Sequence, residues 1–118
     1  MAQYMILIYA PESAYANRTP GDLKQELALW GTYTEEMVKA GIMRGGAQLK
    51  PVSTATTLRT KGGKVVPTDG PFAETKEQLG GYYLIDVPDL DGALKWAGKC
   101  PGVTHGPIEV RPVVPMDL

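Results

Sequence analysis

The stretch that decides the fold reads TDGPFAETKEQLGGYY and spans residues 68–83. It starts with a bend, because Gly70 tolerates positive φ, while Pro71 fixes its own φ and biases its predecessor away from helix. Charged side chains follow, and residues 79–87 then form an apolar run typical of a strand buried on both faces. The stretch predicts a polar loop braced by a sheet, a common location for binding groups.

Further strands are predicted on either side of this stretch. Apolar residues occupy both alternating faces of residues 4–10, which is the pattern of a strand covered on both sides. Residues 54–60 are rich in β-branched side chains, and the glycines at 62–63 predict a hairpin turn after them. Two more strands are expected at residues 42–49 and 108–114.

Two helices are expected between these strands. Thr19 is a predicted N-cap with Pro20 at the first helical position, and Gly41 ends that helix. Leu23, Leu27, Trp30, Thr34 and Met37 recur at spacings of three and four, which predicts one buried face. The second helix starts at an Asp89 N-cap, presents Ala93, Leu94, Trp96 and Ala97 to the core, and ends before residues 101–102.

This order of elements predicts a single α+β domain over residues 1–118, a ferredoxin-like sandwich with an inserted β-hairpin. Both helices would cover one face of the sheet. The other face would then expose Leu, Ile and Tyr side chains, and uncovered apolar patches of that kind usually mark an interface. We therefore expect a homodimer, sheet against sheet, with two-fold symmetry.

The overall charge and the cysteine count exclude several classes of partner. Twelve basic and thirteen acidic side chains give a net charge of −1, so we expect no nucleic-acid partner and no anionic-membrane partner. No segment approaches the ~20 apolar residues needed to cross a bilayer. The single cysteine, Cys100, excludes an intrachain disulfide and favours a cytoplasmic location, and we expect it to be a buried apolar residue.

Two residues of the polar loop are candidates for chemistry. Asp69 has the side chain of a general base, but an Asp before Gly-Pro also stabilises a turn by accepting backbone hydrogen bonds. Glu74 is either a pocket residue or part of a solvated charged face. Phe72, in the same loop, is a candidate ligand contact.

Candidates outside the loop are His105, Arg44 and Tyr82. His105 is the sole histidine and could transfer protons near neutral pH, or it lies in an exposed connection. Arg44 could hold a carboxylate, or it is an edge-strand arginine. Tyr82 and Tyr83 point to opposite faces of a strand, so one of them can offer a phenol to a cavity.

The sequence predicts neither a metal site nor a cofactor. One Cys and one His do not supply the usual ligand set for zinc. The three glycine pairs, at 45–46, 62–63 and 80–81, lack the following Lys-Ser or Lys-Thr of a phosphate loop.

Three segments carry a resemblance to a known family. YMILIY at 4–9, TDGPFAETKEQLGGYYLIDV at 68–87 and EVRPV at 109–113 resemble the DGPF-type proteins of the YCII-related family. The resemblance implies a dimeric α+β barrel of ferredoxin-like subunits. It also implies kinship with small cofactor-free enzymes, among them dehydrochlorinases of chlorinated hydroxyquinones that are proposed to use a His and Asp pair. The family's histidine belongs on the first helix, where residues 27–31 contain none.

Two functional hypotheses follow. The first is a small-molecule-binding homodimer with its pocket between the sheet and the loop from Asp69 to Glu77. The second is a cofactor-free lyase, isomerase or dehydrochlorinase acting on a hydroxylated aromatic or enol, with Asp69 or His105 moving protons.

Overall fold

The computed structural model describes residues 1–116. Within these residues, six strands, two α-helices and three short 3₁₀ turns follow one another. In order, these are β1 (Ala2–Ala10), η1 (Glu12–Tyr15), α1 (Pro20–Lys39), β2 (Met43–Gln48), η2 (Val52–Thr54), β3 (Thr56–Lys61), β4 (Lys64–Asp69), β5 (Gln78–Val87), α2 (Leu90–Gly98), η3 (Pro101–Thr104) and β6 (Ile108–Pro112).

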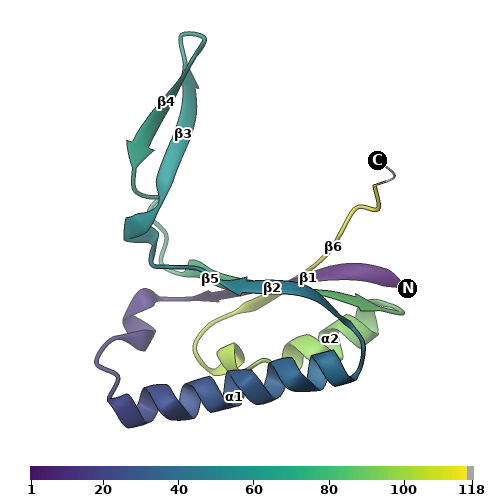
Figure 1. Cartoon of the computed structure of the whole chain (residues 1–118). Helices are drawn as coiled ribbons and strands as arrows, with labels where there is room; N and C mark the ends of the chain where they lie inside the picture. The colour runs from purple at the N-terminus through teal and green to yellow at the C-terminus, as the bar shows by residue number, and fades with distance from the viewer. Residues whose placement is uncertain (117–118) are drawn as a thin grey trace.

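Four of the strands form the main sheet, in the order β2-β5-β1-β6, and all neighbours are antiparallel. Both helices lie on one face of this sheet (Figure 1). The α+β architecture expected from the sequence is therefore present, and the strand order is compatible with a ferredoxin-like fold.

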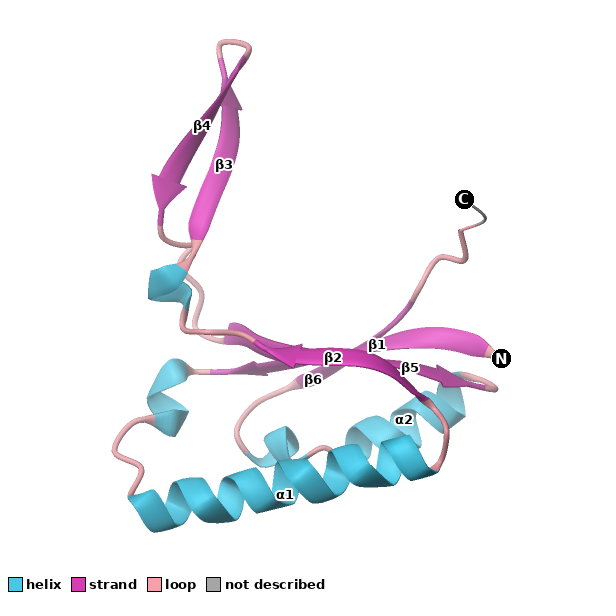
Figure 2. Cartoon of the chain, in the orientation of Figure 1, coloured by secondary structure: helices cyan, strands magenta, loops and turns pink. Residues whose placement is uncertain are grey.

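The core lies between the main sheet and the two helices. In β1, buried and partly exposed side chains alternate. Tyr4, Ile6 and Ile8 are buried, whereas residues 5, 7 and 9 are partly exposed. The buried set packs against residues of both helices and of β5, including Tyr33, Met37, Ile85, Val87, Ala93, Ala97 and Cys100. Within residues 1–116 no helix lies over the opposite face of the sheet, and we call it the open face (Figure 2).

Helix α1 begins where the sequence predicts. The Thr19 hydroxyl accepts a hydrogen bond from the Asp22 backbone N–H, and the Asp22 carboxylate accepts one from the Thr19 N–H, each at 3.1 Å. This reciprocal pair is a capping box, which satisfies N–H groups that the helix leaves unpaired. The hydrogen bond from the Thr19 backbone lowers the pKa of Asp22. Gly41, at φ 72°, follows the end of the helix.

The buried face of α1 differs from the prediction. Tyr33 and Met37 are the buried residues of this helix, whereas Leu23 and Leu27 are 51% and 68% exposed. These two leucines face a cavity beyond the core instead of the core itself. Leu94 of α2, also expected in the core, is exposed as well.

Strands β3 and β4 form a separate two-stranded sheet, which we call the arm (residues 56–69). Gly62 and Gly63, both at positive φ, make the predicted hairpin turn at its tip. At its base the Gly70 N–H donates to the Ala55 carbonyl at 2.7 Å, so the predicted bend is closed by backbone. The arm stands out from the open face of the main sheet, away from the helices (Figure 1).

Within residues 1–116, none of the helices combines the length and the apolar character that crossing a membrane requires.

Candidate functional site

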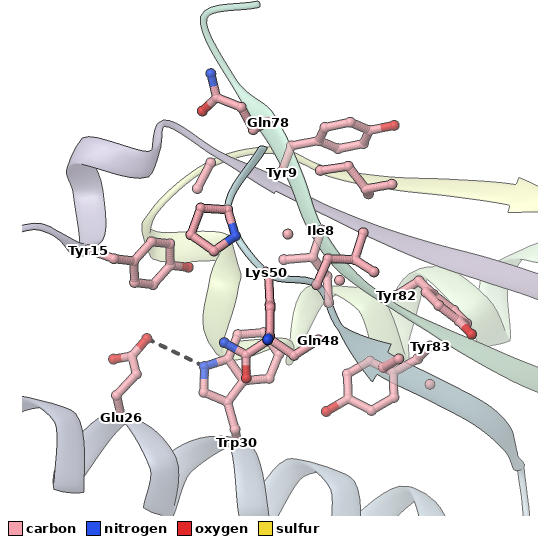
Figure 3. A pocket seen from close by; sticks show the side chains of 18 of the residues that line it. Ile8, Tyr9, Tyr15, Glu26, Trp30, Gln48, Lys50, Gln78, Tyr82 and Tyr83 are labelled. Carbon is pink, nitrogen blue, oxygen red and sulfur yellow. Dashed lines mark hydrogen bonds between the residues drawn. The ribbon is translucent and has the colours of Figure 1, made fainter. Parts of the chain in front are cut away.

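A cavity of about 510 Å³ lies between the first half of α1 and one end of the main sheet. Its wall is made by η1, α1, the end of β1, the start of β5, and β2 with the segment after it (Figure 3). The lining residues include Ile8, Tyr15, Leu23, Glu26, Leu27, Trp30, Thr34, Met43, Gln48, Lys50, Gln78, Leu79, Tyr82 and Tyr83.

Aromatic rings form the inner wall of this cavity. Trp30 stacks on Tyr83 with ring centroids 6.4 Å apart, and Tyr33 meets Tyr83 edge to face at 5.5 Å. The Tyr83 hydroxyl lies 2.7 Å from the Thr34 hydroxyl, which fixes the phenol on the cavity side of the sheet. Burial raises the pKa of Tyr83, so its phenol stays protonated at neutral pH.

Gly46 in β2 makes room for the Tyr83 ring. A Cβ at Gly46 would lie 2.9 Å from Tyr83 Cδ1 and 2.9 Å from the Tyr82 carbonyl oxygen. The Tyr83 ring therefore lies over bare backbone in the neighbouring strand, at a position where any larger residue would collide with it.

A partly buried polar cluster borders the cavity next to Trp30. Glu26 is its centre: Oε1 lies 3.1 Å from His105 Nε2 and 3.4 Å from Trp30 Nε1, while Oε2 lies 3.4 Å from Arg18 Nη1. Arg18 Nη2 also lies 3.2 Å from His105 Nε2. Tyr15 covers the cluster, with its ring 5.1 Å from that of His105. Burial, and then the Glu26 carboxylate, raise the pKa of Tyr15.

This cluster has the composition of a proton-transfer site. A carboxylate next to an imidazole is a pair of side chains that commonly transfers protons, and Glu26 itself lines the cavity. Arg18 balances the carboxylate charge, because its guanidinium pairs with Glu26. A ligand in the cavity would therefore have a carboxylate within reach, with a histidine directly behind it.

The far end of the cavity is lined by the amides of Gln48 and Gln78, by Lys50 and by Glu12. Gln78 Oε1 accepts a hydrogen bond from the Glu12 backbone N–H at 3.0 Å, and Glu12 Oε2 accepts one from the Val52 N–H at 2.9 Å. These bonds tie η1 to the segment after β2. Residues 48–51 of that segment line the cavity and continue through η2 into the arm.

The structure does not bring Asp69 and His105 together. Asp69 ends β4 in the arm, on the open-face side of the sheet, while His105 follows η3 on the helix side (Figure 1). Asp69 is exposed, and among the described residues its side chain makes no hydrogen bond. His105 does lie in the connection before β6, but the expectation that it is exposed there is wrong. Its side chain is 22% exposed and is paired with Glu26.

The other predicted site residues are spread over the molecule. Tyr82 lines the cavity, although its ring points away from Trp30 (Figure 3). Arg44 pairs with Asp86 at 3.6 Å and donates to the Gly41 and Met43 carbonyls at 2.9 and 3.1 Å, as a structural arginine does. Phe72 and Glu74 are exposed on the loop after the arm, and neither belongs to the cavity wall.

Sequence reasoning did not find Arg18, Tyr15 or Glu26. The signal for Glu26 was weak: it precedes Trp30 by four residues, which places both on one side of a helix. Its pairing with His105 spans 79 positions along the chain and has no local signature.

Neither metal ligands nor a reactive thiol adds to the site. Within residues 1–116, no group of three or more His, Cys, Asp or Glu side chains is placed to hold a metal ion. Cys100 is buried as the sequence predicts, and burial raises the pKa of its thiol.

Comparison with known proteins gives two findings. The model of the YCII-related domain family matches residues 2–117, nearly the whole chain. An uncharacterized protein of Rhizobium meliloti (strain 1021) is 38% identical over 112 residues, which covers 93% of this chain and 90% of that protein.

Proposed function

We propose that this chain, which belongs to the YCII-related family, is a homodimer that binds a small hydroxylated aromatic or enol in the cavity beside α1. The observation that carries the proposal is the cavity itself. Its volume of about 510 Å³ is within the range of roughly 300–1,000 Å³ that small-molecule sites occupy.

The chemistry of the cavity wall favours a flat ligand with one polar end. Trp30 and Tyr83 supply aromatic surface, and Leu23 and Leu27 add aliphatic side chains. Hydrogen-bonding groups sit at the edges, above all Glu26. An aromatic ring suits the apolar wall, and a hydroxyl group can donate to the carboxylate.

A thermal-shift screen of hydroxybenzoates, hydroxyquinones and phenols tests this proposal. A ligand at 100 times its Kd adds about 2.7 kcal/mol to the free energy of unfolding. Leu27→Trp places a large ring at the cavity wall and should abolish the shift. Leu29→Trp is the matched control, because Leu29 is exposed on the same helix and does not line the cavity. Equal ligand-induced thermal shifts in the two variants would show that the ligand binds outside this cavity.

The homodimer is supported by the open face of the main sheet. Met5, Leu7 and Tyr9 of β1 lie on this face together with Tyr82 and Leu84 of β5, because residues paired directly across strands share a face. None of the helices in the described part of the chain covers these side chains (Figure 2). Two such faces packed together would make the dimeric barrel that the resemblance implies.

A charge at the centre of the open face tests the dimer. Leu84→Asp should make the protein monomeric in sedimentation equilibrium at micromolar concentration, because an uncompensated carboxylate would be buried in the interface. Val38→Asp, on an exposed position of α1, should leave the assembly unchanged. A wild-type protein that is monomeric at these concentrations would end the dimer proposal.

A second candidate function is acid-base catalysis on the same ligand class. The observation that favours it is the Glu26 to His105 distance of 3.1 Å at the edge of the cavity. In this proposal Glu26 accepts a proton from the bound hydroxyl or carbon acid, and His105 stabilises the charge and exchanges the proton with solvent.

Exchange of substrate protons for deuterium, followed by NMR, tests this candidate with any ligand that the screen finds. Glu26→Gln should slow exchange by about 10²–10⁴-fold, because proton transfer by a positioned side chain contributes that much. His105→Gln should shift the pH profile of exchange. Asp69→Asn tests the alternative base predicted from the sequence. Unchanged exchange in Glu26→Gln would remove the pair from the mechanism.

A further inference from the structure

We infer that the arm contacts a second copy of this chain. In this contact the apolar face of the arm, with Leu58 and Val65, packs against the side of the helix layer of that copy. This inference rests on the homodimer proposed above and adds a second contact to it. Four features of the arm lead to it: its two unlike faces, its isolation from the core, its length, and the side of the sheet from which it projects.

The arm has one apolar and one basic face. Residues paired directly across strands share a face, so Leu58 lies with Pro67, and Val65 lies with Thr60 on the same side. Leu58 and Val65 are 64% and 65% exposed. The opposite face carries three basic residues, Arg59, Lys61 and Lys64, next to the half-buried Val66. A ribbon with this alternation has the pattern of a strand pair that is covered on one side and solvated on the other.

The arm in isolation lacks a partner for its apolar face. A single two-stranded hairpin is at best marginally stable in water, and a third strand or a packing surface is normally required. The radius of gyration, 16.5 Å, exceeds the about 13.5 Å typical of a compact chain of this length. The fold of one chain therefore leaves the arm projecting with its apolar face uncovered.

The length of the arm matches a second subunit on the open face. Each arm strand has six residues and is therefore about 20 Å long at roughly 3.4 Å per residue. Two sheets packed face to face are about 10 Å apart. The arm rises on the open-face side (Figure 1), so it passes beyond a partner sheet docked there and reaches the flank of the partner's helix layer.

A second copy explains the arm better than an unrelated partner does. The open face and the arm lie on the same side of the main sheet (Figure 1), so one docked body can contact both. Under two-fold symmetry the contact occurs twice, because the arm of each copy packs on the helix layer of the other.

The experiment compares two double variants that change the net charge equally. Leu58→Asp/Val65→Asp alters the apolar face, and Lys61→Ser/Lys64→Ser alters the basic face; each lowers the net charge by two. We expect the dimer dissociation constant from sedimentation equilibrium to rise at least about tenfold in the first variant and to stay within about twofold in the second.

A labelling experiment keeps the inference testable if the first variant fails to fold. Leu58→Cys and Lys61→Cys are labelled with an environment-sensitive fluorophore, and the buried Cys100 does not react. The emission of the label at position 58 should shift to the blue as the protein concentration passes through the dissociation constant. The label at position 61 should not shift.

Three outcomes would overturn the inference. A wild-type dimer with an unchanged dissociation constant in Leu58→Asp/Val65→Asp removes the arm contact and leaves the sheet dimer intact. A blue-shifted label at position 58 at every concentration means that the arm folds back on its own chain. A wild-type protein that stays monomeric removes both the arm contact and the proposed dimer.

Discussion

Tyr33 combines deep burial with a hydrogen bond, and this makes it a sensitive residue in the core. It is 3% exposed, and its hydroxyl donates to the Trp96 carbonyl at 2.7 Å. Tyr33→Phe should lower the free energy of unfolding by about 1 kcal/mol at pH 7, because the Trp96 carbonyl keeps the Lys99 N–H but loses its shorter, phenolic hydrogen bond. Urea denaturation followed by tryptophan fluorescence measures this change.

Burial also raises the pKa of Tyr33 well above its usual range. Because the folded-state pKa exceeds the unfolded value of about 10, the stability it contributes is complete below pH 10 and is lost as pH rises through the folded value. The unfolding free energy of the wild type should therefore fall above about pH 10, and Tyr33→Phe should fall less steeply. Parallel curves for the two proteins would contradict the assignment.

Gly46 and Gly45 form a matched pair in β2. A Cβ at Gly46 would meet Tyr83 Cδ1 at 2.9 Å, whereas a Cβ at Gly45 meets its nearest neighbour, Leu84 Cβ, at 4.0 Å. Gly46→Ala should destabilise the protein by about 1–3 kcal/mol, because the strand or the Tyr83 ring must move. Gly45→Ala should change stability by less than about 1 kcal/mol. Urea melts of the two variants compare them directly, and equal values would refute the close approach.

At the scale of elements, the N-terminus of α1 depends on one side chain. Thr19→Ala removes the hydroxyl that caps the Asp22 N–H and should cost about 1 kcal/mol of stability. Thr19→Ser keeps the hydroxyl and should restore stability to within a few tenths of a kcal/mol. Chemical denaturation of the three proteins tests this, and a Ser variant as unstable as the Ala variant would argue against capping.

The same helix shows what sequence can and cannot predict. Its start was predicted from Thr19 and Pro20, because a cap is a contact among residues four or fewer positions apart. The prediction extended its buried face too far toward the N-terminus. Leu23 and Leu27 have the periodicity of core residues but lie beside a cavity. Periodicity identifies an apolar stripe, and the position of the sheet decides which part of that stripe is covered.

The candidate site was harder to predict than the fold. The strand order follows from connectivity and alternation, both of which can be read along the chain. The contact between Glu26 and His105 joins α1 to the turn before β6, and no local pattern links them. Asp69 drew attention because its bend is conspicuous in sequence, but the structure places it on the arm.

At the scale of the whole molecule, the proposed dimer predicts that thermal stability depends on protein concentration. Association stabilises folded chains by mass action, so the unfolding midpoint of the wild type should rise as concentration increases. Leu84→Asp should show a constant midpoint. Differential scanning calorimetry over a hundredfold range of concentration tests this, and a constant wild-type midpoint would contradict a folded dimer that dissociates on unfolding.

Residues 48–51 have a consequence that extends over the whole assembly. They form part of the cavity wall and also lead into the arm, so in the proposed dimer one covalent segment would connect the ligand site to the contact with a second subunit. Coupling between two binding events is reciprocal. If a ligand tightens the pairing of subunits by some factor, the paired form must bind that ligand more tightly by the same factor. The occupancy of the cavity would then act as a thermodynamic control on the assembly.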